Sequence, residues 1–237
     1  MKIGIFDSGL GGLLVAKAIV RAMPEYDYVY LGDTKRVPYG NRLHEAVFEF
    51  TKECVDYLFR KENCAIVIVA CNTASARALR KIQQKYLPKK FPERKVLGVL
   101  IPAAEECVKF KRIGILGTKG TIDSNTFPKE IKKLNRGAKI FQNTAPMLVP
   151  LAEEGEAKNA LPFIKKYLQP LLSKKLDALV LGCTHYPIFK SQIKKLLPKG
   201  VKIISQDEII PKKLKNYFVR HPEIEKKLSK NKTTKIL

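Results

Sequence analysis

Short apolar runs alternate with longer amphipathic stretches along most of the chain. Seven runs rich in Val, Ile and Leu predict β-strands, at residues 2–6, 28–31, 65–70, 95–100, 112–117, 177–182 and 201–205. Six stretches with helical spacing of apolar positions predict helices, at residues 13–22, 43–61, 74–86, 124–134, 157–172 and 188–197. Apolar strands separated by helices indicate mostly parallel sheets flanked by helices, so the expected fold class is α/β.

Part of this pattern occurs twice. KIGIFDS, which begins at Lys2, resembles RIGILGT, which begins at Arg112. AIVIVACNT at Ala65 resembles DALVLGCTH at Asp177, at nearly the same separation. Parallel strands resemble one another by chance, but chance explains poorly a cysteine just past the strand in both copies.

The repeat predicts two similar α/β domains related by a pseudo-twofold axis, with the site between them. The first domain would comprise residues 1–93 and 207–237, and the second residues 94–206. Residues after 207 would return to pack on the first domain. The lysine-rich end, residues 226–237, is expected to be frayed.

The composition is that of a globular protein with a sizeable core, since 45% of the 237 residues are hydrophobic. No apolar run approaches the ~20 residues that a membrane span needs, and Asp7 interrupts the N-terminal run before a signal-peptide core forms. The five cysteines lack the spacing of a disulfide framework or a zinc site. We therefore expect a soluble, cytoplasmic protein with no metal and no membrane partner.

The chain is strongly basic, with a formal net charge of +23. The excess is enriched late in the chain but occurs throughout, it is mostly lysine, and no nucleic-acid-binding motif accompanies it. These features favour a solvated, lysine-rich surface over a nucleic-acid site. A positive field also attracts small anionic substrates.

Four loops follow predicted strands, where α/β proteins bind their ligands. The first, residues 7–12, offers a carboxylate, a hydroxyl and backbone N–H groups at a helix start, although Asp7 or Ser8 could simply cap that helix. It matches neither the GxGxxG nor the phosphate-loop pattern. The second, residues 32–40, contains Tyr39 among turn residues and could equally be an ordinary surface loop.

The third and fourth loops each carry a cysteine. Cys71 opens a helix, where the helix dipole lowers the pKa of a thiol. Cys183 holds the matching place in the second half, and His185 two residues later could tune that thiol or hold a proton. The other three cysteines are expected to be buried apolar residues: Cys54, Cys64 and Cys107.

Two equivalent thiols on facing halves suit the inversion of a carbon that bears hydrogen. One thiolate would remove the proton, and a thiol on the opposite face would return another. A metal site built from the two cysteines and His185 lacks an evident fourth ligand. A Cys-His hydrolase would use Cys183 and His185 but leaves Cys71 unexplained.

Together, the four loops at residues 7–12, 32–40, 70–74 and 182–187 resemble those of the glutamate racemases, in order and spacing. The resemblance spans about residues 1–207 and implies an enzyme of the aspartate/glutamate racemase superfamily. Such an enzyme interconverts L- and D-glutamate by two-cysteine proton transfer at Cα, needs no cofactor, and supplies D-glutamate for peptidoglycan. An aspartate racemase or a one-cysteine decarboxylase would share the fold, and the second cysteine argues against the decarboxylase.

The resemblance also implies residue roles. Cys71 would act on D-glutamate with help from Asp7, and Cys183 on L-glutamate with help from His185. Glu153 would be a further acid near the site, although Glu154 adjoins it. The expected substrate-binding residues are Asp7, Ser8, Pro38, Tyr39, Gly40, Asn72, Thr73, Thr118, Thr121, Thr184 and His185.

The chain departs from the family pattern in three places. Lys35 adds positive charge near the expected mouth of the site, residues 206–208 match only loosely the short segment that follows the last strand, and the C-terminal stretch is basic. The resemblance implies glutamate as the partner, and nucleic acid is not expected despite the net charge of +23. The oligomeric state is left open, with a homodimer as the candidate assembly.

Overall fold

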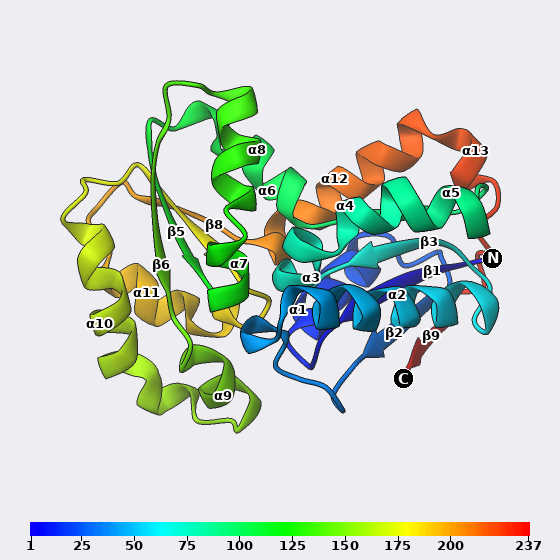
Figure 1. Cartoon of the computed structure of the whole chain (residues 1–237), viewed down its shortest axis with the longest axis horizontal. Helices are drawn as coiled ribbons and strands as arrows, with labels where there is room; N and C mark the ends of the chain where they lie inside the picture. Colours follow the sequence, from blue (N-terminus) through cyan, green and yellow to red (C-terminus); the bar gives the residue numbers. More distant parts are fainter.

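The computed structural model describes all residues, Met1–Leu237, and contains two parallel β-sheets that form the cores of two lobes (Figure 1). The first sheet has the strand order β4-β3-β1-β2-β9, and the second the order β6-β5-β7-β8. The strands of the first sheet are β1 (Lys2–Asp7), β2 (Tyr28–Gly32), β3 (Cys64–Val69), β4 (Lys95–Gly98) and β9 (Thr234–Ile236). Those of the second are β5 (Arg112–Gly117), β6 (Lys139–Thr144), β7 (Ala178–Gly182) and β8 (Lys202–Ile204).

The two sheets share one topology, which confirms the α/β class and the internal repeat. The order β4-β3-β1-β2 of the first sheet corresponds strand by strand to β8-β7-β5-β6 of the second, and every pairing is parallel. The first pair of repeated sequence segments contains β1 and β5, and the second pair contains β3 and β7. Cys71 and Cys183 therefore follow equivalent strands.

Helices cover both faces of the first sheet because side chains along a strand point alternately to opposite faces. On one face Ile5 packs in a cluster with helices α1 (Gly12–Ala22) and α12 (Gln206–Arg220). On the other, Phe6 packs with helix α2 (His44–Arg60). Figure 1 shows α12 lying over the first lobe although it follows β8 of the second. The C-terminal segment thus lies against the first lobe.

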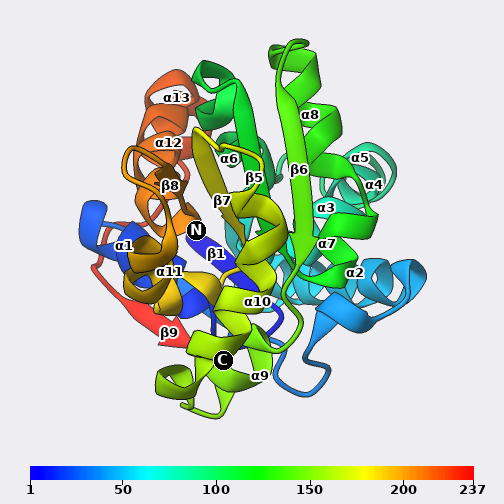
Figure 2. The same cartoon turned by 90° about the vertical axis from the view of Figure 1, so that its left-hand side faces the viewer.

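The second sheet is enclosed in the same way. Leu116 packs in a cluster with helix α10 (Leu161–Leu172), and Ile115 packs on the opposite face with α8 (Thr126–Leu134). Figure 2 shows α10 and α8 on different sides of the strands. None of the helices combines the length and apolar content that a membrane span requires.

The remaining elements are shorter. The α-helices are α3 (Asn72–Arg77), α4 (Leu79–Lys81), α5 (Leu87–Lys90), α6 (Leu100–Glu106), α7 (Lys119–Asp123), α9 (Leu148–Glu153), α11 (Lys190–Leu196) and α13 (Pro222–Glu225). The 3₁₀ turns are η1 (Tyr39–Asn41), η3 (Cys107–Lys109), η4 (Ala157–Ala160) and η5 (Tyr186–Phe189), and η2 (Ile82–Tyr86) is a π-helical turn.

All seven predicted strands are present, and two strands were not predicted. Strand β6 lies at a sheet edge and buries none of its six residues fully, so it lacks an apolar run. The predicted helix at 74–86 is divided into α3, α4 and η2, all of which pack against the first half.

Strand β4 differs from the expected domain division. A boundary between residues 93 and 94 assigns this strand to the second domain, yet β4 pairs with β3 of the first sheet, with Ile66 opposite Lys95 and Val69 opposite Gly98. The pairing completes the same four-strand order that β8 completes in the second sheet. Sheet pairing therefore favours a division after Gly98.

The C-terminal end is not frayed as expected, because β9 extends the first sheet along β2. Buried Asp27 anchors the segment that leads to β9. Its carboxylate accepts bonds from the backbone N–H of Asn231 and of Thr233, at 3.2 and 2.9 Å, and from both of their side chains, each at 2.7 Å. A lysine-rich composition did not reveal these long-range bonds.

We predict that Asp27→Ala destabilises the protein by about 2–4 kcal/mol, because it leaves several buried donors without an acceptor. Burial alone would raise the pKa of Asp27, but hydrogen bonds from the C-terminal segment outweigh it and hold this pKa well below its usual range. The stabilisation should therefore be present above pH ~4 and lost as the pH falls below that. Denaturant unfolding of both proteins across this pH range measures it.

The matched control is Asp123→Ala, which removes only an exposed pair with Lys119 and should change stability by less than about 0.5 kcal/mol. Hydrogen exchange at Asn231 and Thr233 should accelerate in Asp27→Ala alone. Equal effects of the two substitutions would contradict the anchoring role of Asp27.

Candidate active site

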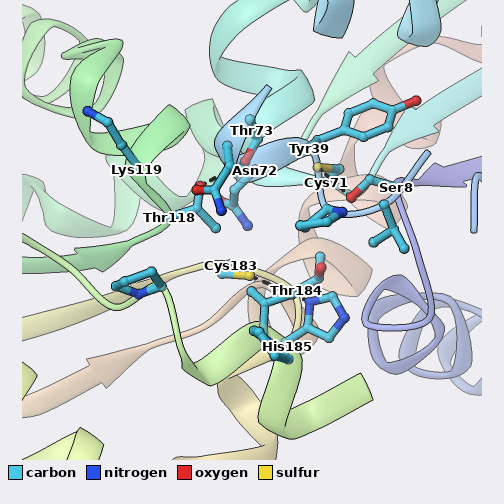
Figure 3. A pocket seen from close by; sticks show the side chains of 17 residues that line it. Ser8, Tyr39, Cys71, Asn72, Thr73, Thr118, Lys119, Cys183, Thr184 and His185 are labelled. Atoms are coloured by element: carbon cyan, nitrogen blue, oxygen red, sulfur yellow. Dashed lines mark hydrogen bonds between the residues drawn. The ribbon is translucent and has the colours of Figure 1, made fainter. Parts of the chain in front are cut away.

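A cavity of about 50 Å³ lies between the two halves, at the carboxyl ends of β1, β3, β5 and β7 (Figure 3). Both halves contribute to its walls. The lining residues that the sequence predicted are Ser8, Pro38, Tyr39, Gly40, Cys71, Asn72, Thr73, Thr118, Cys183, Thr184 and His185. Three predicted residues, Asp7, Thr121 and Glu153, do not line the cavity and contact lining residues from behind.

Cys71 follows β3 and caps the first turn of α3, where the N–H of Ala74 donates to its sulfur at 3.5 Å. Ser8 Oγ lies 3.3 Å from the same sulfur. Burial and the nearby charge of Asp7 raise the pKa of the Cys71 thiol to about 11, although hydrogen bonds from Ser8 and Ala74 oppose the shift. The backbone N–H groups of Thr73 and Ala74 at the start of α3 lower this pKa, as the sequence predicted, but they do not offset desolvation, so the net shift is upward.

Cys183 follows β7 on the other side of the cavity, and Figure 3 shows the two cysteines on opposite walls. Its sulfur lies 3.6 Å from Nδ1 of His185. Burial is the main cause that raises the pKa of Cys183, the backbone N–H of His185 opposes it, and the charge of Cys71 adds to it. The thiols thus lie near enough for the charge of one to disfavour the charge of the other.

Glu153, at the end of α9, orients His185. The distance from its Oε1 to Nε2 of His185 is 2.5 Å, and the same oxygen accepts the N–H of Leu10 from the first half at 3.2 Å. Glu154 is exposed and makes no such contact, so Glu153 is the member of the pair that reaches the site. The result is a hydrogen-bonded chain from Cys183 through His185 to Glu153.

Asp7 is fully buried behind the cavity. Its carboxylate accepts the N–H of Gly9 at 3.0 Å and the hydroxyl of Thr184, from the other half, at 3.2 Å. Burial raises the pKa of Asp7 despite the opposing charge of His185 and these two bonds. A carboxylate with a raised pKa accepts a proton more readily than a free one does.

Three threonine hydroxyls meet across the boundary between the halves. Thr73 Oγ1 lies 2.9 Å from that of Thr118 and 3.3 Å from that of Thr121, and the last two are 3.1 Å apart. Thr73 and Thr118 line the cavity, whereas Thr121 supports them from behind. This contact joins α3 of the first half to α7 of the second.

The hydroxyl of Tyr39 does not point into the cavity, although the sequence predicted Tyr39 as a substrate-binding residue. The hydroxyl donates to Asp33 at 2.5 Å, and Figure 3 shows it directed away from the cysteines. Burial, followed by this bond, raises the pKa of Tyr39. Gly40 allows close approach of the two halves, because a Cβ there would lie 2.8 Å from Cβ of Thr118.

Sequence reasoning missed several lining residues, of which Lys119 brings a positive charge. Lys119 directly follows Thr118 at the start of α7, the place after β5 that corresponds to the first loop after β1. That correspondence within the repeat could have identified it. Its Nζ pairs with Asp123 at 2.6 Å. Lys35 does not line the cavity.

No three His, Cys, Asp or Glu side chains have an arrangement that could hold a metal ion. The arrangement that is present is one of proton exchange: two thiols on opposite walls, each with a neighbouring acid or base.

Comparison with known proteins identifies the family of this chain. Residues 11–209 match the family described as Asp/Glu/Hydantoin racemase. The chain belongs to that family. It is therefore an isomerase of the racemase type.

Several relatives of this chain are glutamate racemases. The glutamate racemase of Sulfurihydrogenibium sp. is 43% identical over 91% of this chain and 82% of its own length, and that of Aquifex aeolicus is 42% identical over 92% and 83%. Among solved structures, a glutamate racemase isoform from Bacillus anthracis has a TM-score of 0.87 at 36% identity, and that of Francisella tularensis in complex with D-glutamate has 0.89 at 30%. Each of these two matches covers 99% of this chain and 86% of the chain of the solved structure. An aspartate racemase from Picrophilus torridus, at 19% identity and a TM-score of 0.63 over 92% of this chain and 94% of its own, shares the fold.

We predict that both thiols are mainly protonated at pH 7 in the ligand-free protein, because their pKa values are raised. The alkylation rate of Cys71 by iodoacetamide should rise about tenfold per pH unit and level off only near pH 11. Asp7→Asn should accelerate alkylation of Cys71 at neutral pH, because it removes a charge that disfavours the thiolate. Mass spectrometry of the labelled peptides measures the rate at each cysteine.

Glu93→Gln is the control, since Glu93 is an exposed carboxylate that pairs with Lys227, and neither residue lines the cavity, so the rate at Cys71 should stay unchanged. An unchanged rate in Asp7→Asn as well would mean that Asp7 is already neutral and does not control the thiol.

Proposed function

We propose that the protein interconverts L- and D-glutamate by proton transfer at Cα, with Cys71 and Cys183 as the two acid/base residues and without a cofactor. The observation that carries the proposal is the pair of buried thiols on opposite walls of one cavity between equivalent strands. A planar carbanion can be reprotonated from either face, so inversion requires one proton carrier on each side.

The choice of glutamate is supported by the relatives. Glutamate racemases are about 40% identical to this chain over nine-tenths of its length, and the Francisella tularensis structure holds D-glutamate. An aspartate racemase and an aspartate racemase homologue that share the fold are only 19% and 16% identical to this chain.

In the proposed mechanism, one cysteine as thiolate takes the Cα proton, so that an S–H bond forms as the Cα–H bond breaks. The electron pair remains on the substrate, and the opposite thiol then donates its proton to the other face of Cα. Cys71 acts on D-glutamate and Cys183 on L-glutamate, and the reverse reaction exchanges their roles. Each turnover thus leaves the two thiols in exchanged protonation states.

The raised thiol pKa values mean that ionisation requires help. Asp7 would receive a proton on the Cys71 side, and His185, held by Glu153, would do so on the Cys183 side. The substrate ammonium brings a positive charge between the sulfurs, which favours a thiolate.

The carbanion must be stabilised by donors already in place, because the Cα–H of an amino acid is a very weak acid. The hydroxyls of Ser8, Thr73 and Thr118 and the amide of Asn72 would hold the substrate carboxylates. The hydroxyl of Thr184 already donates to Asp7, so it would accept from the substrate ammonium. The cavity has room for about four waters at ~10–15 Å³ each. Substrate admission would therefore require the halves to separate and close again, which also excludes water.

We also place the reaction in the cytoplasm, as the source of D-glutamate for peptidoglycan. The five cysteines are free thiols, which suits a reducing compartment.

The chain Cys183–His185–Glu153 also has the order of a cysteine hydrolase. That alternative predicts an acyl-enzyme on Cys183 and no need for Cys71. The racemase predicts no acylation and an equal need for both thiols.

We predict that Cys71→Ala and Cys183→Ala each lower racemisation of both enantiomers by about 10³-fold or more, because each removes one of the two proton carriers. In D₂O, the unaltered protein should place deuterium at Cα of each product without added cofactor. Circular dichroism of glutamate follows inversion, and NMR follows deuterium.

The control is Cys107→Ala, which truncates an equally buried thiol outside the cavity and should retain activity. Substantial racemisation by either Cys71→Ala or Cys183→Ala would refute the two-thiol mechanism. Activity on aspartate in place of glutamate would refute the substrate.

We predict that Gly11→Ala lowers kcat about 10- to 100-fold by displacing His185 from Cys183. The φ of Gly11 is −58°, which alanine adopts readily, but its Cβ would lie 2.7 Å from two atoms of the imidazole ring. Gly137→Ala is the control, because its Cβ would meet only Asn135 Oδ1 at 3.7 Å. Equal kcat values for the two variants would contradict this role of the ring position.

A further inference from the structure

Gln206 is completely buried at the point where the chain crosses from the second half to the first. It is the first residue of α12, two residues after β8 ends in the second sheet. The rest of α12 packs on the first half, where Ile210 and Leu214 join the cluster around β1. The sequence around Gln206 is also one of the places where this chain departs from the family pattern.

The side chain of Gln206 reaches the active site through one hydrogen bond. Its Nε2 donates to Oδ1 of Asn72, 134 residues earlier, at 3.1 Å. Asn72 directly follows Cys71, is 2% exposed and lines the cavity (Figure 3).

This bond determines what Asn72 presents to a ligand. A primary amide has an acceptor oxygen on one side and a donor nitrogen on the other. Since Gln206 occupies the oxygen, the nitrogen is free to donate, and Nδ2 of Asn72 is buried without any hydrogen-bond partner. An unpaired buried donor destabilises the protein, and an acceptor that enters the cavity removes that cost.

We propose that Gln206 is a positioning residue that holds the Asn72 amide with its N–H₂ group directed at a substrate carboxylate. The inference rests on the proposed function, because it takes the ligand to be an amino acid with carboxylates. Gln206 does not line the cavity, so it acts only through Asn72. It also makes the binding of substrate depend on the crossover between the halves.

The test compares Gln206→Met with the unaltered protein. Methionine keeps the length of the side chain and removes the donor, so the Asn72 amide can rotate. We expect KM for both glutamate enantiomers to rise about 5- to 10-fold, the equivalent of one hydrogen bond. The kcat should change less than about twofold, because the hydroxyls of Ser8, Thr73 and Thr118 remain in place to stabilise the carbanion.

A double-mutant cycle separates positioning from a general structural effect. If Gln206 acts through Asn72, then Gln206→Met should add nothing to the KM of Asn72→Ala. Gln206→Glu, which can only accept, should turn the Asn72 nitrogen away from the cavity and raise KM more than Gln206→Met does.

Gln192→Met is the matched control. Gln192 likewise makes one bond through Nε2, to the carbonyl of Ala157 at 3.0 Å, and has a buried Oε1 without a partner. It lies on α11 outside the cavity, so KM and kcat should stay unchanged. If Gln206→Met does not fold, Gln206→Asn carries the same expectation, because its shorter side chain cannot span to Asn72.

The outcomes are distinct. An unchanged KM in Gln206→Met, or KM effects that multiply in the double variant, would overturn the positioning role while leaving the racemase intact. Failure of the unaltered protein to racemise glutamate would instead overturn the proposed function.

Discussion

Burial of the two thiols is the constraint on which the rest of the site depends. Cys71 and Cys183 are both buried, and the resulting desolvation raises the pKa of each thiol. A buried thiol keeps its proton until a neighbour or ligand favours the thiolate. The groups that can exchange a proton or a hydrogen bond with the sulfurs lie beside them. Ser8 contacts the sulfur of Cys71, His185 contacts that of Cys183, and the buried carboxyl of Asp7 lies behind them.

The contact between the halves is correspondingly polar where it borders the cavity. Thr184 donates to Asp7, Thr73 meets Thr118, the N–H of Leu10 donates to Glu153, and Gln206 donates to Asn72. Each bond joins the first half to the second. A purely apolar contact would hold the halves together without orienting these groups, whereas these directional bonds align the two walls with each other.

Glycines permit this alignment. A Cβ at Gly11 would overlap His185, and one at Gly12 would lie 2.3 Å from Cβ of Asp7. A Cβ at Gly40 would lie 2.8 Å from Cβ of Thr118. The glycine-rich first loop, which lacks the spacing of a nucleotide-binding loop, thus lets the backbone approach the acid and the imidazole of the site. Its function is close packing of the two halves.

Local pattern alone determined the seven strands, the repeat, the four loops and the two cysteines, because apolar periodicity and the residues after a strand are properties of short segments. Tertiary structure decided the rest. Only packing revealed that Glu153 holds His185, that Gln206 reaches Asn72, and that the hydroxyl of Tyr39 turns to Asp33. The pairing of β4 and β9 with the first sheet likewise depends on partners distant in the chain. Tertiary structure also decided the direction of the thiol pKa shift. Desolvation depends on everything that surrounds the sulfur rather than on the helix that begins beside it.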